Sequence, residues 1–566
     1  MQKHILFLFI FSLFLCIIGY FIFYPIFYSN NIIIPFAIHP FNIVSEYPDT
    51  WKFLKFLFIF SYIISSIIIS NLICLIFIKQ PNKITKSANI CNNSGLKLYL
   101  GKNLDNFPVY ITENSLFQNI LITGTIGTGK TSSSMYPFTE QLISYQASDS
   151  SLKLGMLILD VKGNYASKVK EYCKKYNRQS DLCIICLGKK IKYNPLDKPK
   201  LKPSVLANRL RTILTLFSPN STEDYWLDKV EEILTEAIKF CRLYNNNYVT
   251  FEELHKLITS KQFYNEKVSI LKNMFLSNIL SPSQEFDLLS SIQFFEKEFF
   301  SLDTRTLSIL KSEVTRITSV FVSDYDILST FCPKKEDISF NGFKDVLENG
   351  KIVTLQMNIA EYRNLSKIIA TYLKLDFQTE VLLRLKKVAV PSRYCAFICD
   401  EYHEYVTNTD GLFFSQSREA KCINIVATQS YTSLLNTLHD KSSVEVILQS
   451  FTNKLWFRND DLYTIESCQK QIGKEEKIMI SKNISENAQE TSLNYLTLSL
   501  DSKKSNISEG ITKYTQLDFC YDFKFLTQEL ETFSCLAFLS DGNKIIPPQK
   551  IKLIPYFKKE DKYENF

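Results

Sequence analysis

Histidine, glycine and metal-binding motifs are scarce in this 566-residue sequence. It contains five histidines and 15 glycines, and no His-Glu-x-x-His motif. The pattern Cys183-Ile-Ile-Cys186 lies inside the apolar stretch 182–187, which favours a buried strand over a redox or metal site. With no second Cys-x-x-Cys, a zinc site is disfavoured, and so is a zinc metalloprotease. The net charge of +7 is mild, and no compact Lys/Arg run marks a nucleic-acid groove.

Three of the few glycines fall within the six positions 124–129. Together with Lys130 and Thr131 they complete the G-x-x-x-x-G-K-[ST] pattern, and a chance Gly-rich turn is the alternative reading. The apolar run 119–123 before them predicts a buried strand, and residues 132–142 can continue as a helix. In that setting backbone N–H groups point at phosphate oxygens, Lys130 neutralises the β- and γ-phosphates, and the Thr131 hydroxyl ligates Mg²⁺.

We therefore predict that the chain binds a nucleoside triphosphate, with ATP and Mg²⁺ as the cofactors. The residues predicted to hold the nucleotide are Gly124, Thr125, Gly127, Thr128, Gly129, Lys130, Thr131 and Ser132.

Two uncharged apolar runs, residues 5–28 and 56–78, are long enough to cross a bilayer as helices. A secretory signal peptide is the alternative for the first run, but the run is too long and bulky residues occupy 24–26, where a cleavage site would need small ones. Positive residues flank the outer ends of the pair, at Lys3, Lys79, Lys83 and Lys86. The positive-inside rule then predicts a two-helix membrane anchor with both termini in the cytoplasm.

The remaining residues alternate strand-like and helix-like segments in two blocks. The expected strands are 120–123, 156–160, 183–187, 352–357, 394–399, 423–428 and 454–457, with later ones near 535–539 and 550–553. Such alternation predicts an α/β fold with a parallel sheet covered on both faces. Helical segments dominate between the two blocks, at 207–217, 226–244, 251–258 and 306–322. Residues 481–518 are polar, which predicts a surface excursion before the last strands.

These patterns predict four parts of the chain. They are a membrane anchor (1–90), the first part of a P-loop ATPase domain (91–199), an inserted all-α domain (200–345) and the second part of the ATPase domain (346–566).

The segment 394–401 is an apolar run that ends in two carboxylates, Asp400 and Glu401. This is the form of a Walker B strand. Asp400 is predicted to hold Mg²⁺, because that ion prefers oxygen ligands, and Glu401 to deprotonate the attacking water. A strand ending in a capped turn is the alternative.

Two more polar residues are candidates for catalysis. Gln429 ends the next apolar strand, where its amide could contact the γ-phosphate or only cap the following helix. Arg418, expected on a helix, could stabilise charge at a neighbouring subunit's nucleotide or form a surface ion pair. Asp160 begins a polar turn after the second strand, at the sheet edge where ligands bind; a structural turn explains it equally well.

In the order and spacing of these motifs, the chain resembles the type IV secretion coupling proteins, the TraG/TraD-like ATPases of bacterial conjugation. The resemblance extends over nearly the whole chain: the two apolar runs, the Gly-rich loop, LILDVKGN at 157–164, YNPL at 193–196, DYW at 224–226, the 394–401 strand and the SREA…ATQS segment at 417–430. It is weak in the helical segment and in residues 481–518.

The resemblance implies a RecA-like ATPase domain that assembles as a ring, typically a homohexamer, at the bacterial cytoplasmic (inner) membrane. It assigns Gly129, Lys130 and Thr131 to the nucleotide, and Asp400 and Glu401 to magnesium and hydrolysis. Gln429 matches the family's polar residue after the next strand, and Arg418 its intersubunit arginine. The implied partners are type IV secretion channel components and a substrate, either relaxase-bound single-stranded DNA or a protein effector.

Other functions remain open at this point. A DNA-pumping ATPase of the FtsK/HerA sort shares the ATPase core, although no basic helical DNA-reading module follows residue 520. A membrane-anchored AAA+ protease or signalling NTPase is a third possibility, and a non-hydrolysing receptor a fourth. The complete set of ATPase residues argues against the receptor.

Overall fold

The computed structural model describes residues 49, 56, 60, 63, 64, 95–216, 224–357, 359–386, 393–486, 492–494, 499–501 and 507–558. The chain divides into two compact units, Met1–Ser94 and Gly95–Phe566. The predicted spans 5–28 and 56–78 lie outside the described residues, apart from positions 56, 60, 63 and 64. Among the residues that are described, none of the helices has the length and hydropathy needed to cross a membrane.

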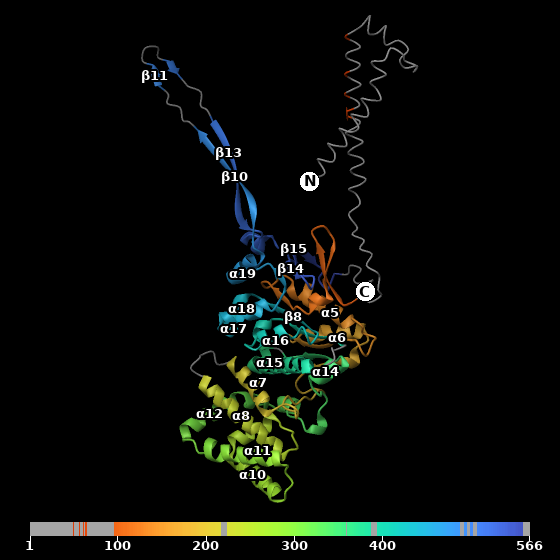
Figure 1. Ribbon diagram of the computed structural model, residues 1–566, viewed down its shortest axis with the longest axis vertical. Helices are drawn as coiled ribbons and strands as arrows, with labels where there is room; N and C mark the ends of the chain where they lie inside the picture. The colour runs from red at the N-terminus through yellow and green to blue at the C-terminus, as the bar shows by residue number, and fades with distance from the viewer. Residues whose placement is uncertain are drawn as a thin grey trace. The chain divides into compact units, whose positions relative to one another are not determined.

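An eleven-stranded sheet forms the centre of the Gly95–Phe566 unit, with the order β2-β1-β15-β14-β9-β3-β8-β7-β4-β6-β5 (Figure 1). Seven neighbouring strands are parallel: β9 (Asn453–Phe457), β3 (Ile120–Thr123), β8 (Cys422–Thr428), β7 (Cys395–Cys399), β4 (Gly155–Leu159), β6 (Ile352–Leu355) and β5 (Leu182–Ile185). Most of them are apolar and wholly buried, as expected for strands covered on both faces. The predicted α/β class is therefore confirmed.

The predicted parallel sheet is only part of the whole sheet, because four antiparallel strands extend one side. They are β14 (Ser534–Ser540), β15 (Ile545–Leu553), β1 (Lys97–Asn103) and β2 (Pro108–Thr112). In β2 buried and exposed residues alternate, which is the pattern of a strand with one face in water. Neither β1 nor β2 was among the strands expected from the sequence, because their short alternating runs carry a weaker signal than the buried strands.

Successive residues of the parallel strands enter two different cores. Leu121, Leu157 and Phe397 belong to a core that includes α15 (Ile359–Leu383). Their chain neighbours Ile122, Ile158 and Ile398 belong to a second core that includes α5 (Tyr136–Ser144) and α6 (Tyr165–Lys175). This division follows from the two-residue period of a strand, and it places helices on both faces of the sheet. The remaining helices of the sheet region are α4 (Glu113–Leu116), α16 (Asp410–Gln416), α17 (Tyr431–Leu438), α18 (Lys441–Gln449) and α19 (Leu462–Ile472).

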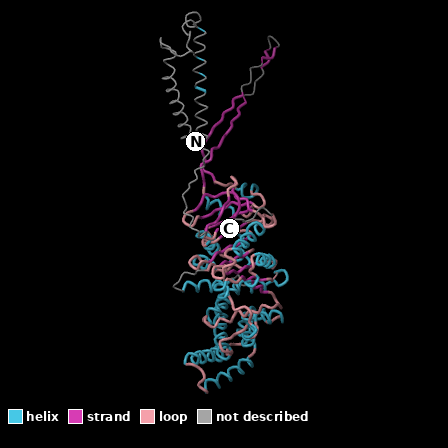
Figure 2. The backbone as a smooth tube through the Cα atoms, turned by 90° about the vertical axis from the view of Figure 1, so that its right-hand side faces the viewer, coloured by secondary structure: helices cyan, strands magenta, loops and turns pink. Residues whose placement is uncertain are grey.

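The described residues between β5 and β6 form helices and contain no strand. The helices are α7 (Pro203–Thr215), α8 (Asp224–Tyr244), α9 (Phe251–Thr259), α10 (Lys261–Leu276), α11 (Pro282–Gln293), α12 (Thr304–Thr318), α13 (Tyr325–Phe331) and α14 (Phe343–Asn349). In Figure 2 one end of the Gly95–Phe566 unit contains helices and loops without strands, while the strands lie together with further helices in the rest of the unit. The domain boundaries predicted at 90, 199 and 345 remain predictions.

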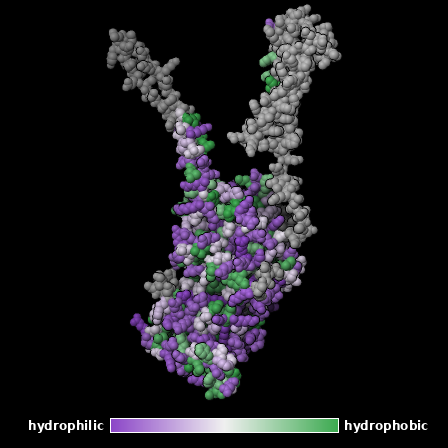
Figure 3. Space-filling model, viewed as in Figure 1, coloured by the Kyte–Doolittle hydropathy of each residue, from purple (hydrophilic) through white to green (hydrophobic). Residues whose placement is uncertain are grey.

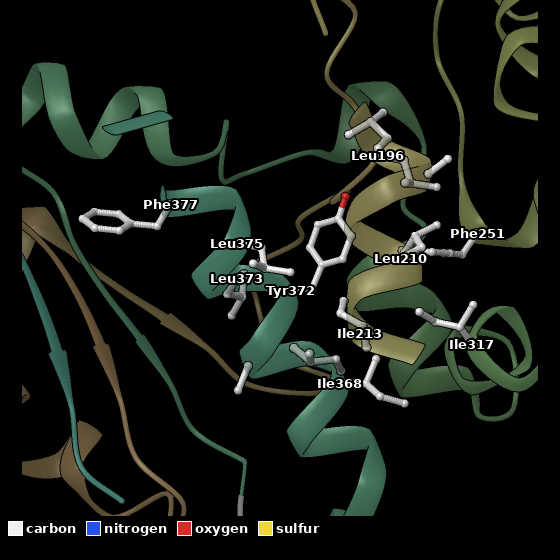
Figure 4. Packing of buried hydrophobic residues seen from close by; sticks show 14 of the residues in the cluster. Leu196, Leu210, Ile213, Phe251, Ile317, Ile368, Tyr372, Leu373, Leu375 and Phe377 are labelled. Carbon is white, nitrogen blue, oxygen red and sulfur yellow. The ribbon is translucent and has the colours of Figure 1, made fainter. Parts of the chain in front are cut away.

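Helix α15 joins this helical part to the sheet. On one side its Ile368 and Tyr372 pack near Ile213 of α7 and Phe251 of α9, and its other side bears Phe377 (Figure 4). The Phe377 ring centroid lies 6.2 Å from that of Phe397 in the central strand β7. A single apolar cluster therefore runs from the inserted helices to the sheet.

The described residues within 481–518, expected as a surface excursion, belong mainly to a long antiparallel ribbon. Strands β10 (Lys474–Glu486) and β13 (Ile507–Phe519) pair along their whole length, and β11 (Ser492–Asn494) pairs with β12 (Ser499–Asp501). Ile478, Ile480 and Leu517 are exposed aliphatic residues of the ribbon, and hydrophobic and hydrophilic residues mix along its described part in Figure 3. The polar composition hid this ribbon because both of its faces meet water, so neither needs an apolar pattern.

Candidate functional site

The predicted nucleotide loop connects the carboxyl end of β3 to the helical turn η2 (Thr131–Met135), which continues into α5. Gly127 and Gly129 have φ angles of +80° and +95°, which favour glycine. Within the described part of the chain, no carbonyl accepts from the backbone N–H groups of residues 127–130. Consecutive free N–H groups in such a loop form an anion-binding concavity.

Lys130 places its ammonium group inside this loop. Its Nζ donates to the carbonyls of Gly124 and Thr125, the second at 3.1 Å. Burial lowers the pKa of Lys130, whereas the nearby carboxylates of Glu401 and Asp400 act to raise it. A phosphate anion would act in the same direction as those carboxylates and favour the charged lysine.

Thr131 and Asp400 meet directly, although 269 positions separate them in the sequence: the Thr131 hydroxyl donates to Asp400 Oδ2 at 2.7 Å. Asp400 follows β7 and is only 3% exposed. Burial is the main cause that raises the pKa of Asp400 to about 6; Glu401 and Asp160 raise it further, while the Thr131 hydrogen bond and Lys130 oppose the shift. A hydroxyl and a buried carboxylate suit a hard cation such as Mg²⁺, whose charge would favour the ionised acid.

Glu401 adopts a left-handed backbone conformation, with φ 51° and ψ 48°. Such a conformation is uncommon for a residue other than glycine and is typical of functional sites. Its Oε2 atom is buried and has no hydrogen-bond partner among the described residues. The conformation therefore holds a carboxylate oxygen beside the nucleotide loop with its acceptor capacity unused.

His403, which is not among the residues predicted from the sequence, lies between Glu401 and Thr428, the residue before Gln429. Its Nδ1 is 3.7 Å from Glu401 Oε2 and 3.2 Å from the hydroxyl of Thr428, the last residue of β8. Burial lowers the pKa of His403, and Glu401 and Glu404 oppose that shift. Its position two residues after the Asp-Glu pair is the only sequence signal that could have identified it.

The segment after Glu401 is fastened to α15 by a buried ion pair. Lys374 and Asp410 are both fully buried, and Lys374 Nζ lies 2.6 Å from Asp410 Oδ2. Asp410 also accepts from the Tyr402 hydroxyl, and Lys374 donates to the Tyr405 carbonyl. Removing one member of such a pair leaves an uncompensated buried charge, so the pair fixes the path of the chain after Glu401.

Gln429 lies beside the nucleotide loop. It directly follows β8, which pairs in parallel with β3, and its carbonyl accepts from Gly124 N–H at 3.3 Å and from Asn459 Nδ2 at 3.0 Å. Asp160 follows β4 and accepts from Tyr165 N–H at 3.2 Å, which gives it a role in the turn that starts α6. Burial raises the pKa of Asp160.

Arg418 does not join this group. It lies in an exposed turn before β8 instead of on the expected helix, because α16 ends at Gln416. The nucleotide loop is at the other end of the parallel strands, and the seven residues of β8 separate the two by roughly 20 Å. The structure thus brings together Lys130, Thr131, Asp400, Glu401 and Gln429, and excludes Arg418 from the site of its own subunit.

Comparison with known proteins identifies the family. The model of the family described as "Type IV secretion-system coupling protein DNA-binding domain" matches residues 108–507, more than half of the chain. A search of curated proteins gives no match.

Similar solved structures include that of the bacterial conjugative coupling protein TrwBdeltaN70 in its unbound monoclinic form. It is 13% identical, with a TM-score of 0.53 over 80% of this chain and 88% of that chain. Plasmid coupling protein TrwB with the GTP analogue GDPNP is 12% identical (TM-score 0.51; 80% and 89% covered), and TrwB with ADP and Mg²⁺ is 13% identical (0.51; 81% and 89%). At these identities the likeness shows a shared α/β fold. Since the family match covers most of the sequence, the chain belongs to the type IV secretion-system coupling protein family.

Proposed function

We propose that this protein is a membrane-anchored ATPase that delivers a substrate to a type IV secretion channel. The observation that carries the ATPase proposal is the 2.7 Å hydrogen bond between Thr131 and Asp400, which joins the two predicted halves of a magnesium–nucleotide site. The solved TrwB complexes support it, because one is a complex with GDPNP and another a complex with ADP and Mg²⁺.

In this proposal Thr131 and Asp400 would hold Mg²⁺, which would supply positive charge to neutralise the phosphates. Lys130, at the centre of the loop, binds the β- and γ-phosphates. Glu401 accepts the proton of the attacking water with its unused oxygen, and Gln429, at the edge of the loop, orients that water or senses the γ-phosphate. Arg418 is proposed to act on the nucleotide of a neighbouring subunit in a hexameric ring.

The substrate is proposed to be relaxase-bound single-stranded DNA or a protein effector. The family description, which names a DNA-binding domain of coupling proteins, supports this class. The helices between β5 and β6 are proposed to recognise the substrate. Residues 5–28 and 56–78 are proposed to anchor the protein in the bacterial cytoplasmic membrane, with both termini and the ATPase domain on the cytoplasmic side.

Replacing the loop lysine tests the nucleotide site. Lys130→Ala is expected to abolish ATP binding or hydrolysis without unfolding the protein, because its ammonium contacts loop carbonyls and supports no apolar core. Binding is measured by calorimetry and hydrolysis by phosphate release. The matched control is Lys162→Ala, since Lys162 is exposed and electrostatically close to Lys130. An unchanged ATPase rate in Lys130→Ala would refute the site.

His403 offers a test of how the catalytic glutamate is held. His403→Asn is expected to lower kcat roughly 10- to 100-fold with little change in KM, because small displacements of a catalytic group carry such costs. The control is His439→Asn, at a left-handed position that asparagine tolerates. Equal kcat values for the two variants would show that His403 does not position Glu401.

Deleting residues 1–80 tests the anchor. The truncated protein is expected in the soluble fraction after membrane sedimentation, with a lower specific ATPase activity, because anchoring in one plane raises the effective concentration of subunits. Crosslinking and light scattering measure assembly. If the truncated protein forms hexamers readily at micromolar concentration, the N-terminal segment does not promote assembly and serves only as an anchor.

A further inference from the structure

Two C-terminal segments contact the nucleotide loop through their backbones. Phe533, which precedes β14, donates its N–H to the Thr128 carbonyl at 3.0 Å. Tyr556, which follows β15, donates its N–H to the Ser132 carbonyl at 2.9 Å. Residues more than 400 positions away in the sequence therefore form a wall beside the loop and the start of its helix.

The Phe533 ring is fixed against the loop. Its φ is +65°, a conformation that is costly for a bulky side chain, and the Leu553 N–H donates to its carbonyl at 2.8 Å. A Cβ atom added to Gly129 would lie 2.4 Å from the ring, so glycine at this position allows the aromatic contact. Backbone strain of this kind persists where the surrounding structure holds it in place.

Phe557 adds a second, open aromatic surface. Its ring is 56% exposed and lies 5.9 Å from the Phe533 ring at an interplanar angle of 72°. The Phe533 ring also lines a cavity of about 440 Å³, within the size range of small-molecule sites. Its wall combines apolar residues (Phe533, Leu553, Ile554 and Pro555) with four lysines (Lys102, Lys550, Lys552 and Lys558) and a few other polar groups.

The strand order places Phe533 on one side of the nucleotide loop and the proposed catalytic carboxylates on the other. Strand β3, which leads into the loop, has β9 and then β14 on one side, and β8 and then β7 on the other. Asp400 and Glu401 follow β7, whereas Phe533 precedes β14. Phe533 therefore lies on the side of the loop away from Asp400, and the Phe557 ring packs beside it.

We propose that Phe533, Phe557 and the adjoining cavity bind the base and ribose of the nucleotide. This inference rests on the proposed ATPase function and adds the subsite for the part of the ligand beyond the phosphates. The open Phe557 ring stacks on the base, an interaction available to every base because each has a π-face. Lys102 and Lys552, directly opposite each other across β1 and β15, supply donors for ring nitrogens and ribose hydroxyls. A ring nitrogen or hydroxyl oxygen that accepts from these lysines also reduces the repulsion between their two ammonium groups, which face each other.

The test compares ATP with inorganic tripolyphosphate, which has the phosphates but no nucleoside. Binding of each to the full-length protein is measured by calorimetry in wild type, Phe557→Ala and Phe557→Tyr. Phe557→Ala is expected to weaken ATP binding roughly 5- to 100-fold, the range found for base–aromatic stacking, while tripolyphosphate binding stays unchanged. Phe557→Tyr keeps the ring and is expected to restore ATP binding. Phe286→Ala, at a 73% exposed phenylalanine of α11, is the control and should alter neither.

Two results would overturn the subsite while leaving the ATPase proposal intact. One is a wild-type protein that binds ATP no more tightly than tripolyphosphate. The other is a Phe557→Ala variant that loses both ligands equally or neither. If the wild type binds neither ligand in a manner that depends on Lys130, the proposed function fails, and the subsite fails with it.

Discussion

Glu401→Gln is expected to lower kcat for ATP hydrolysis by about 10²- to 10⁴-fold, the contribution typical of a general base, while ATP still binds. The amide fills the volume of the carboxylate but cannot accept a proton from water. The phosphate-binding groups Lys130 and Thr131 are untouched by the change, so the variant should trap ATP. Single-turnover phosphate release measures the chemical step, and calorimetry measures binding.

A nearby acid provides the control for this prediction. Glu404 lies three residues further along, and its carboxylate is 3.6 Å from both His403 Nε2 and Lys367 Nζ. Glu404→Gln alters the local charge by the same amount and leaves Glu401 in place, so its kcat should remain near that of the wild type. Similar losses of kcat in both variants would indicate a general electrostatic effect. Near-normal turnover in Glu401→Gln would show that Glu401 is not the general base.

The left-handed backbone of Glu401 explains why this carboxylate and not Asp400 is the expected base. Asp400 accepts from the Thr131 hydroxyl and from the Glu401 N–H, so its oxygens are engaged. Glu401 turns away from the strand direction, and one buried oxygen keeps no hydrogen bond among the described residues. In the proposed site, the backbone conformation therefore gives two adjacent acids different surroundings, which suit Asp400 to metal binding and Glu401 to proton acceptance.

The sequence predicted the parallel strands well because their signal is local. Ile120–Thr123 matches β3 at both ends, and the predicted run 423–428 differs from β8 by one residue, since buried strands are continuous apolar runs. Strands β1 and β2 escaped detection because half-exposed strands need only about every second residue to be apolar. The ribbon of β10 and β13 escaped for the stronger reason that neither face is buried in the described chain.

The residues of the candidate site show the same difference between local and non-local signals. The loop at 124–132 and the pair Asp400–Glu401 have fixed local spacing, so the sequence could identify them before their contact was known. Phe533 and His403 carry no such spacing, because their positions depend on how β14 and the turn after β7 pack against the loop. Residues that reach a site only through tertiary packing are not accessible to a motif.

Arg418→Ala is expected to leave ATP binding intact and to lower turnover by as much as the roughly 10³- to 10⁵-fold associated with arginine fingers. The turn before β8 puts Arg418 at the sheet edge opposite its own nucleotide loop, so a catalytic contact requires another subunit. Its exposed side chain has no hydrogen bond or ion pair with the described residues, which leaves it available for such a contact. Arg305→Ala, at another exposed arginine, is the control for loss of a surface charge.

Subunit mixing separates an intersubunit role from every other one. An Arg418→Ala subunit keeps a working nucleotide loop, and a Lys130→Ala subunit keeps its arginine, so each alone forms rings of defective sites. In mixed rings some sites combine the intact loop of one subunit with the intact arginine of the next, and hydrolysis should recover there. Exchange is verified by fluorescence transfer between labelled subunits. Verified mixing without recovery would mean that Arg418 takes no part in the chemistry, because the length of β8 already excludes action within its own subunit.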